Sequence, residues 1–102
     1  MEPTDGPVLV TVSYTVRPSA LPSFEAAMRP LAGSRRRTGG YRWRLYRSGE
    51  DQDVMLESFM VPSWGEHRRQ QTQRLTGRDR EIRSAVLEFC AGAPIERHYF
   101  PA

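Results

Sequence analysis

The chain has 102 residues, 38% of them hydrophobic, and a formal net charge of +3 in which all 15 basic residues are Arg. This length indicates one domain with a modest core, and no apolar run approaches the roughly 20 residues of a membrane-spanning helix. The single cysteine, Cys90, excludes an intrachain disulfide and a cysteine-cluster metal site. Residues 1–7 lack the pattern of a signal peptide, so we expect a flexible leader and a cytoplasmic protein.

The first predicted element is a strand over Val8–Val16. Its even-numbered positions are hydrophobic, whereas Leu9, Thr11, Ser13 and Thr15 alternate with them. This period of two is typical of a strand that is half buried. We expect the hydrophobic face to pack against helices and the semi-polar face to line a cavity or an interface.

A helix is predicted from an N-cap at Ser19 to about Arg37. Apolar side chains recur in this segment at spacings of three and four residues, which gives one apolar stripe. Pro30 lies inside the segment, where it is expected to kink or break the helix. Gly39 and Gly40 supply the C-terminal stop.

Two further strands are predicted as a hairpin. Tyr41, Trp43 and Leu45 alternate with Arg42, Arg44 and Tyr46, and a turn follows at residues 48–51. The second strand covers Val54–Val61 and is stopped by Pro62.

The last part of the chain is predicted to be helical, with a short final strand. Ser63 and Glu66 have the spacing of a capping box, as do Thr76 and Asp79, so the region up to Cys90 divides into two helical segments. An apolar stripe in the second segment, made of Ile82, Ala85, Val86, Phe89 and Cys90, is expected to face the core. Residues 95–100 form the final strand.

The order strand, helix, strand, strand, helix, strand predicts a ferredoxin-like α+β sandwich over residues 8–102. Such a fold has a four-stranded antiparallel sheet with helices on one face only. We expect the other face to hold groups such as Leu9, Met55 and Tyr46. A second copy of the chain is the natural cover for it, which predicts a homodimer.

The segment Glu57-Ser58-Phe59, followed by Trp64 and His67, resembles the antibiotic biosynthesis monooxygenase-like family of dimeric α/β-barrel proteins. A resemblance over nearly the whole chain is to the soluble C-terminal domain of some bacterial major-facilitator transporters. It rests on AAMRPL, SRRRTGGYRW and SWGEHRRQ. The first resemblance implies a small oxidoreductase that needs no flavin or metal, because an electron-rich substrate reduces O₂ itself.

Trp64 and His67 are the candidate catalytic residues. An imidazole can orient or deprotonate a phenol, and an indole can stack on a flat ring. A pocket for a planar anionic molecule is predicted from side chains that supply aromatic surface or polar contacts: Trp43, Tyr41, Tyr14, Phe59, Arg44 and Gln71. Gln71 stands where a second His was expected. An enclosed pocket of roughly 300 Å³ or more that reaches His67 would favour an enzyme.

No cofactor and no metal site are predicted. His67 and His98 lie far apart in the sequence, without an HxH or HxxxH spacing. Haem through His67 is disfavoured because relatives that degrade haem pair the His with an Asn, which this chain lacks. RNA binding is disfavoured because the third strand carries Glu57 at its centre in place of an aromatic pattern.

Two functions remain open at this stage. The first is a cofactor-independent monooxygenase or cyclase that acts on a hydrophobic polycyclic metabolite, as in secondary metabolism. The second is a non-catalytic dimerisation or small-ligand-binding domain related to the transporter module. Neither requires nucleic acid or membrane insertion.

Overall fold

A computed structural model of the chain describes residues 6–102, so most of the predicted flexible leader, residues 1–7, lies outside the described residues. The strands are β1 (Val8–Thr15), β2 (Tyr41–Arg47), β3 (Val54–Val61) and β4 (Ile95–Tyr99). The helical elements are η2 (Pro18–Ala20), α1 (Leu21–Arg37), α2 (Trp64–Arg69), η3 (Gln70–Arg74) and α3 (Gly77–Leu87).

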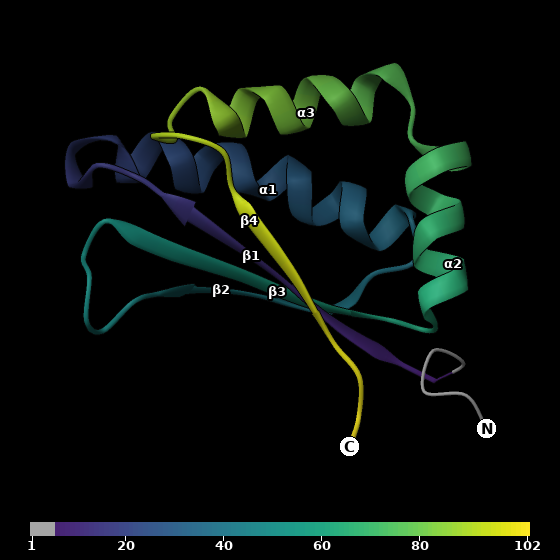
Figure 1. Ribbon diagram of the computed structural model, residues 1–102. Coiled ribbons are helices and arrows are strands. Elements are labelled where there is room, and N and C mark those ends of the chain that lie inside the picture. The colour runs from purple at the N-terminus through teal and green to yellow at the C-terminus, as the bar shows by residue number, and fades with distance from the viewer. Residues whose placement is uncertain (1–5) are drawn as a thin grey trace.

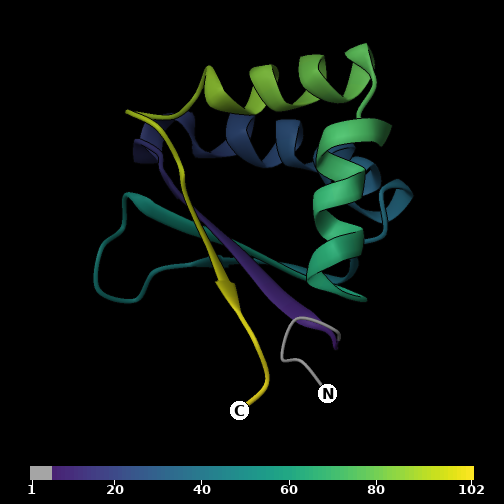
Figure 2. The ribbon, with the colours of Figure 1, turned by 45° about the vertical axis from the view of Figure 1, so that its right-hand side comes forward.

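The four strands form one antiparallel sheet in the order β2-β3-β1-β4, and α1 and α3 lie side by side over one of its faces (Figure 1). This arrangement confirms the predicted ferredoxin-like α+β sandwich. Turning the molecule by 45° shows α2 standing steeply at one end of the helix layer, where β3 ends (Figure 2). The helix layer therefore covers one face of the sheet, with α2 at one end of it.

The core follows from the alternation in β1 and β3. Val8, Val10 and Val12 are at most 4% exposed, and Phe24 and Met28 of α1 pack from the other side at 0% and 1%. Every second residue of each central strand points to the helices, which is the predicted pattern.

A bulge changes the predicted alternation in β2. Tyr41 is opposite Met60 and Arg44 is opposite Ser58, so the register slips by one residue between them. Arg42 has a φ of 53° in the left-handed region, which a single extra residue in a bulge can adopt. Tyr41 therefore shares the face of Met60, away from the helices, and its predicted grouping with Trp43 on one face is wrong.

Of the two outcomes expected at Pro30, a kink or a break, the break does not occur, because helix α1 continues through this residue. Pro30 cannot donate to the carbonyl of Ala26, but both residues are exposed, so water can take the place of the missing donor. The predicted N-cap at Ser19 is wrong. Ser19 lies within the short turn η2, and the N-cap of α1 is Ala20, which makes no side-chain cap.

The two predicted capping boxes have different outcomes. Thr76 and Asp79 form a complete box, with the Asp79 N–H donating to Thr76 Oγ1 at 3.2 Å and the Thr76 N–H donating to Asp79 Oδ2 at 2.8 Å. Ser63 Oγ accepts from the Glu66 N–H at 3.1 Å, but the Glu66 carboxylate accepts from Arg69 and Gln70 instead of returning to Ser63. The helical region is divided as predicted.

The second face of the sheet is left without a helix (Figure 1). Tyr46, Ile95 and Tyr99 on it are 51%, 54% and 48% exposed. Met55 was predicted to lie on this face, but it pairs with Tyr14 and is 4% exposed in the core. Leu56 occupies the outer position in its place.

Within residues 6–102, none of the helices combines the length and the apolar character needed to cross a bilayer.

Candidate functional site

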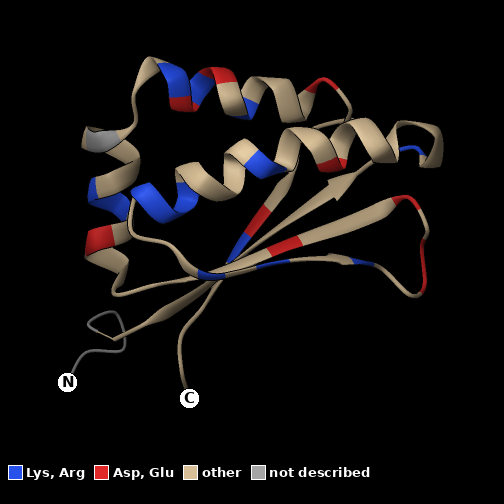
Figure 3. Ribbon diagram, turned by 180° about the vertical axis from the view of Figure 1, so that it is seen from behind, with Lys and Arg blue, Asp and Glu red and all other residues tan. Residues whose placement is uncertain are grey.

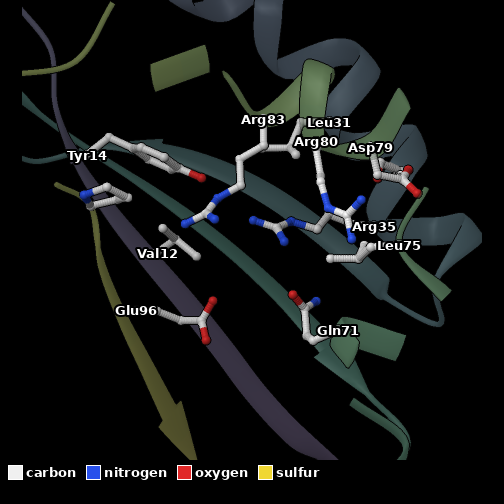
Figure 4. Close-up of a pocket in the computed structure, with 12 residues that line it drawn as sticks. Val12, Tyr14, Leu31, Arg35, Gln71, Leu75, Asp79, Arg80, Arg83 and Glu96 are labelled. Carbon is white, nitrogen blue, oxygen red and sulfur yellow. Dashed lines mark hydrogen bonds between the residues drawn. The ribbon is translucent and has the colours of Figure 1, made fainter. Parts of the chain in front are cut away.

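A cavity of about 510 Å³ lies between the sheet and the helices (Figure 4). Val12 and Tyr14 of β1 form one wall, and Leu31 and Arg35 of α1 form another. Ser34 of α1 and Gln71 of η3 also line it. The remaining lining comes from the chain around α3 and β4: Leu75, Asp79, Arg80, Arg83, Pro94 and Glu96. Because its walls come from five different parts of the chain, the cavity exists only in the folded domain.

Three guanidinium groups reach into this cavity. Figure 4 shows Arg80 and Arg83 extending from α3 and Arg35 from α1 into the same space. Basic residues occur on all three helices of the layer (Figure 3). Arg35 is paired with Glu57, whereas among residues 6–102 neither Arg80 nor Arg83 has a carboxylate within 4.0 Å. This wall therefore carries two exposed positive charges that have no ion-pair partner among the described residues.

Arg35 is held by a buried polar network around Glu57. Arg35 donates to both carboxylate oxygens, from Nε at 3.0 Å and from Nη2 at 3.1 Å. Tyr14 Oη donates at 2.7 Å and Trp43 Nε1 at 2.8 Å. Glu57 is 0% exposed, so four charge-assisted hydrogen bonds replace the water that it lost.

The network fixes the protonation of its members. Burial and the negative charge of Glu57 raise the pKa of Tyr14 far above its usual range, so its hydroxyl stays a donor. Burial lowers the pKa of Arg35, but the Glu57 carboxylate outweighs burial and the net pKa is raised. Tyr14 and Arg35 thus present a fixed phenol and a fixed positive charge to the cavity.

The negative charge of Asp79, which also lines the cavity, is compensated by its hydrogen-bond partners. It accepts hydrogen bonds from Arg37, from Ser34 Oγ at 2.6 Å and from Thr76. The contact with Arg37, although opposed by burial, holds the pKa of Asp79 well below its usual range. This carboxylate therefore ties α3 to α1 and leaves the guanidinium groups of α3 free to act on a ligand.

A second cluster lies at the α2 end of the sheet. The ring centroid of Trp64 is 4.5 Å from that of His98, 5.8 Å from that of His67 and 6.1 Å from that of Phe100. His67 is 4% exposed, and burial is the main cause that lowers its pKa, so its imidazole is neutral at pH 7. Aromatic surface and imidazole groups thus gather on this side, next to the cavity residue Glu96.

The sequence of residues 1–99 matches the model of a protein family described as transmembrane secretion effector. The chain belongs to this family. None of the curated proteins compared with this family member matches its sequence.

Solved structures share the fold of this family member. An antibiotic biosynthesis monooxygenase-like protein from Caulobacter crescentus superimposes with a TM-score of 0.80 at 20% identity, covering 97% of this chain and 92% of the other. A protein of the same description from Bordetella bronchiseptica gives 0.78 at 23% identity, with coverages of 95% and 98%. SnoaB, a cofactor-independent oxygenase from Streptomyces nogalater, gives 0.78 at 16% identity, with coverages of 95% and 94%. These likenesses establish the fold.

The residues predicted for one site are separated in this secretion-effector chain. Tyr14 and Gln71 line the cavity. Trp43 contacts Glu57 behind it, and Phe59 is buried between Arg35 and His67.

The other four predicted residues lie away from the cavity lining. His67 and Trp64 belong to the aromatic cluster, so the cavity exceeds the expected volume but His67 is not among its lining residues. Tyr41 and Arg44 pair with Met60 and Ser58 on the opposite face of the sheet.

Sequence reasoning missed several residues that the fold brings to the site. Arg80 and Arg83 are three residues apart on one helix, a spacing that places two charges on the same side. Glu96 and His98 are two apart on a strand and therefore share a face. These local signals were present, but nothing in the sequence indicated which face of α3 or β4 would meet β1.

Proposed function

We propose that this domain is a cofactor-independent enzyme of the monooxygenase type. Its substrate class is a polycyclic secondary metabolite with a phenol or an enolisable ketone, bound as the anion in the cavity under α3. The observation that carries the proposal is the convergence of Arg80 and Arg83, without carboxylate partners among the described residues, beside the fixed charge of Arg35. The shared fold with SnoaB supports the reaction type.

The charge of the cavity favours an anion. Like charges that converge in one hollow repel each other, and a bound anion relieves this repulsion. The same field lowers the pKa of an acidic hydroxyl group on the ligand, because positive neighbours stabilise its ionised form. The proposed site therefore does not need His67 as a base.

The shape of the cavity suits a flat molecule. Its volume of about 510 Å³ lies within the roughly 300–1,000 Å³ that small-molecule sites occupy. Val12, Leu31 and Leu75 supply apolar wall, and Tyr14 adds an aromatic face. An aromatic ring system would lie against these side chains with its anionic oxygen toward the guanidinium groups.

The proposed oxidation needs only the substrate and O₂. Water or hydroxide from solvent takes a proton from a ring CH₂ group, and the electron pair of the resulting enolate reduces O₂ and forms a new carbon–oxygen bond to a peroxide anion. The peroxide anion takes up one proton from solvent to become a hydroperoxide, which then loses water and leaves a ketone. One oxygen atom ends in the ketone and the other in water, so no external reductant is consumed. The protein contributes binding, charge stabilisation and exclusion of solvent.

The test is oxygen uptake with enolisable polycyclic ketones and polycyclic phenols, using protein treated with EDTA. We expect uptake that depends on the protein, and a fall in kcat/KM of at least about tenfold in Arg80→Gln and in Arg83→Gln. Arg68→Gln, on the exposed side of α2, is the matched control and should retain activity. Variants that keep full activity would remove α3 from the mechanism.

The alternative function is ligand binding without catalysis. It is favoured by the family description, transmembrane secretion effector, which names no chemical reaction. In this case the cavity binds the same anionic class and releases it unchanged. Binding that requires Arg80 and Arg83 but gives neither oxygen uptake nor product would establish the alternative.

We also propose that the sheet face without helices forms a homodimer. It exposes Tyr46, Ile95 and Tyr99, and a hollow of about 390 Å³ runs between Leu9, Leu56 and their neighbours. Burial of such a patch by its own copy would remove apolar surface from water. Light scattering should give twice the monomer mass, and Ile95→Glu should shift it to the monomer. A wild-type monomer at micromolar concentration would contradict the dimer.

A further inference from the structure

Two histidines and a glutamate converge beside the cavity. One donor atom from each of His67, Glu96 and His98 lies within 4.8 Å of the others. His98 Nε2 is 2.8 Å from Glu96 Oε2, and the two imidazole centroids are 5.6 Å apart. His67 and His98 are 31 residues apart in the sequence (98 minus 67), so the fold brings the three side chains together.

The backbone directs all three side chains to the same point. Glu96 is paired with Val12 and His98 with Val10, so both occupy the helix-facing side of β4. His67 projects from α2, whose start is fixed by the Ser63 cap. The donors therefore come from a strand and a helix of defined position.

Aromatic side chains surround the two imidazoles. Trp64 packs edge-on against His98, and Phe59 lies against His67 with centroids 6.4 Å apart. Contacts of this kind restrict how far each imidazole can rotate, and shells of this kind tune metal sites by limiting water. Glu96 is the open member, with 43% of its side chain exposed, so an ion has a path of entry from solvent.

We propose that His67, Glu96 and His98 bind one divalent transition-metal ion, with two imidazole nitrogens and one carboxylate oxygen as ligands. This donor set occurs at zinc sites that keep a fourth position for water or substrate. Metal–ligand bonds of about 2.0–2.1 Å in a tetrahedron need donors about 3.4 Å apart. The most widely separated donors must therefore close by up to about 1.4 Å, whereas Glu96 Oε2 and His98 Nε2, at 2.8 Å, must move slightly apart. Rotation of the exposed Glu96 side chain supplies part of this movement.

The site goes beyond the proposed oxidation, which uses no metal. Its location gives it a consequence for the cavity, because Glu96 belongs to both. An ion bound there would neutralise the carboxylate that faces the guanidinium groups and would make the cavity more positive. The ion would then strengthen anion binding without taking part in the reaction.

The test is titration of metal-free, untagged protein with Zn²⁺ by calorimetry. We expect one ion per chain with a Kd at or below micromolar, and a loss of affinity of at least about tenfold in His98→Ala and in Glu96→Gln. Both variants change partly exposed side chains and should fold, which far-UV circular dichroism checks. Cys90→Ser is the matched control, because Cys90 is the only thiol of the chain and lies elsewhere, and it should bind Zn²⁺ like wild type.

Two results would overturn the proposal. One is the absence of Zn²⁺ binding to wild type at about 100 μM metal, and the other is wild-type affinity in His98→Ala. In either case Glu96 and His98 form only a hydrogen-bonded pair at the edge of the sheet. Because binding is read by calorimetry and oxygen uptake is measured in EDTA, failure of this site is distinguishable from failure of the proposed function.

Discussion

Two polar clusters lie under the helices on the same face of the sheet, and they are built in opposite ways. Around Glu57, each carboxylate oxygen accepts two hydrogen bonds, and the carboxylate is completely buried. Around Glu96, the carboxylate has His98 as its partner and remains 43% exposed. The Glu57 cluster cannot exchange its hydrogen-bond partners without loss of stability, whereas the Glu96 carboxylate can accept a further partner. This difference assigns a positioning role to the first cluster and a binding role to the second.

The largest effect is expected from Glu57→Gln. The substitution keeps the shape of the side chain but removes the charge that compensates Arg35 in the interior. Leaving a buried charge without its partner costs about 3–5 kcal/mol in the free energy of unfolding. Urea denaturation measures this loss, with Glu66→Gln on α2 as the control. A loss below about 1 kcal/mol would mean that the Glu57 cluster is as adaptable as the other one.

The contribution of Asp79, which links α3 to α1, to the free energy of unfolding should depend on pH. The pKa of Asp79 is lowered by folding, so its contribution to stability is present in full above the pKa of the unfolded state, about 3.9, and is lost progressively as the pH falls from there towards the lower pKa of the folded state. We expect Asp79→Asn to cost about 1–3 kcal/mol at pH 6 and progressively less as the pH falls below about 4. Denaturation at several pH values measures both, and Asp53→Asn in the exposed hairpin should change the stability by no more than about 0.5 kcal/mol. A cost independent of pH would contradict the ion pair.

Tyr14→Phe sharpens the comparison inside the Glu57 cluster. It removes one of four hydrogen bonds to Glu57 and leaves Arg35 and Trp43 in place. Because the acceptor is charged, we expect a loss of about 1.5 kcal/mol, smaller than that of Glu57→Gln. Thermal and urea denaturation give the value. A loss equal to that of Glu57→Gln would show that the phenol, and not Arg35, is the main partner.

The smallest effect is expected in the open cluster. His98→Ala removes the partner of Glu96 at a partly exposed position, where ion pairs contribute roughly 0–1 kcal/mol. The stability of the metal-free protein should therefore change by about 1 kcal/mol or less, although Zn²⁺ affinity falls. A loss above about 2 kcal/mol would indicate that His98 is a structural residue like Glu57.

The fold could be predicted from the sequence because its strands and helices follow from local patterns of apolar and capping residues. The alternation in β1 and β3 and the Thr76–Asp79 capping box predicted the elements that the structure shows. The face of the sheet on which Tyr41 lies was predicted wrongly, because a one-residue bulge places the residues before it on the opposite face from the one that simple alternation gives. The sequence could not show that α1 continues through Pro30, because the cost of a missing donor depends on the exposure of Ala26, which depends on tertiary packing.

The site was accessible only in part. Tyr14 and Gln71 were predicted to contact a ligand and do line the cavity. Arg80 and Arg83 were missed because charged residues on a helix are usually solvated. Both are in fact exposed, and only the placement of α3 over β1 makes them border the cavity. The grouping of His67 with His98 depends on β4 returning beside β1, a pairing between residues far apart in the chain.

The central claim is that the cavity holds its ligand as an anion, and the ionisation of a bound phenol tests it most directly. The absorbance of 2-naphthol can be followed against pH, free and in the presence of saturating protein treated with EDTA. The account predicts that the bound phenol has a pKa at least about one unit below the free value, equivalent to about 1.4 kcal/mol, and that the double variant Arg80→Gln/Arg83→Gln abolishes the shift. A bound pKa equal to or above the free value would contradict it.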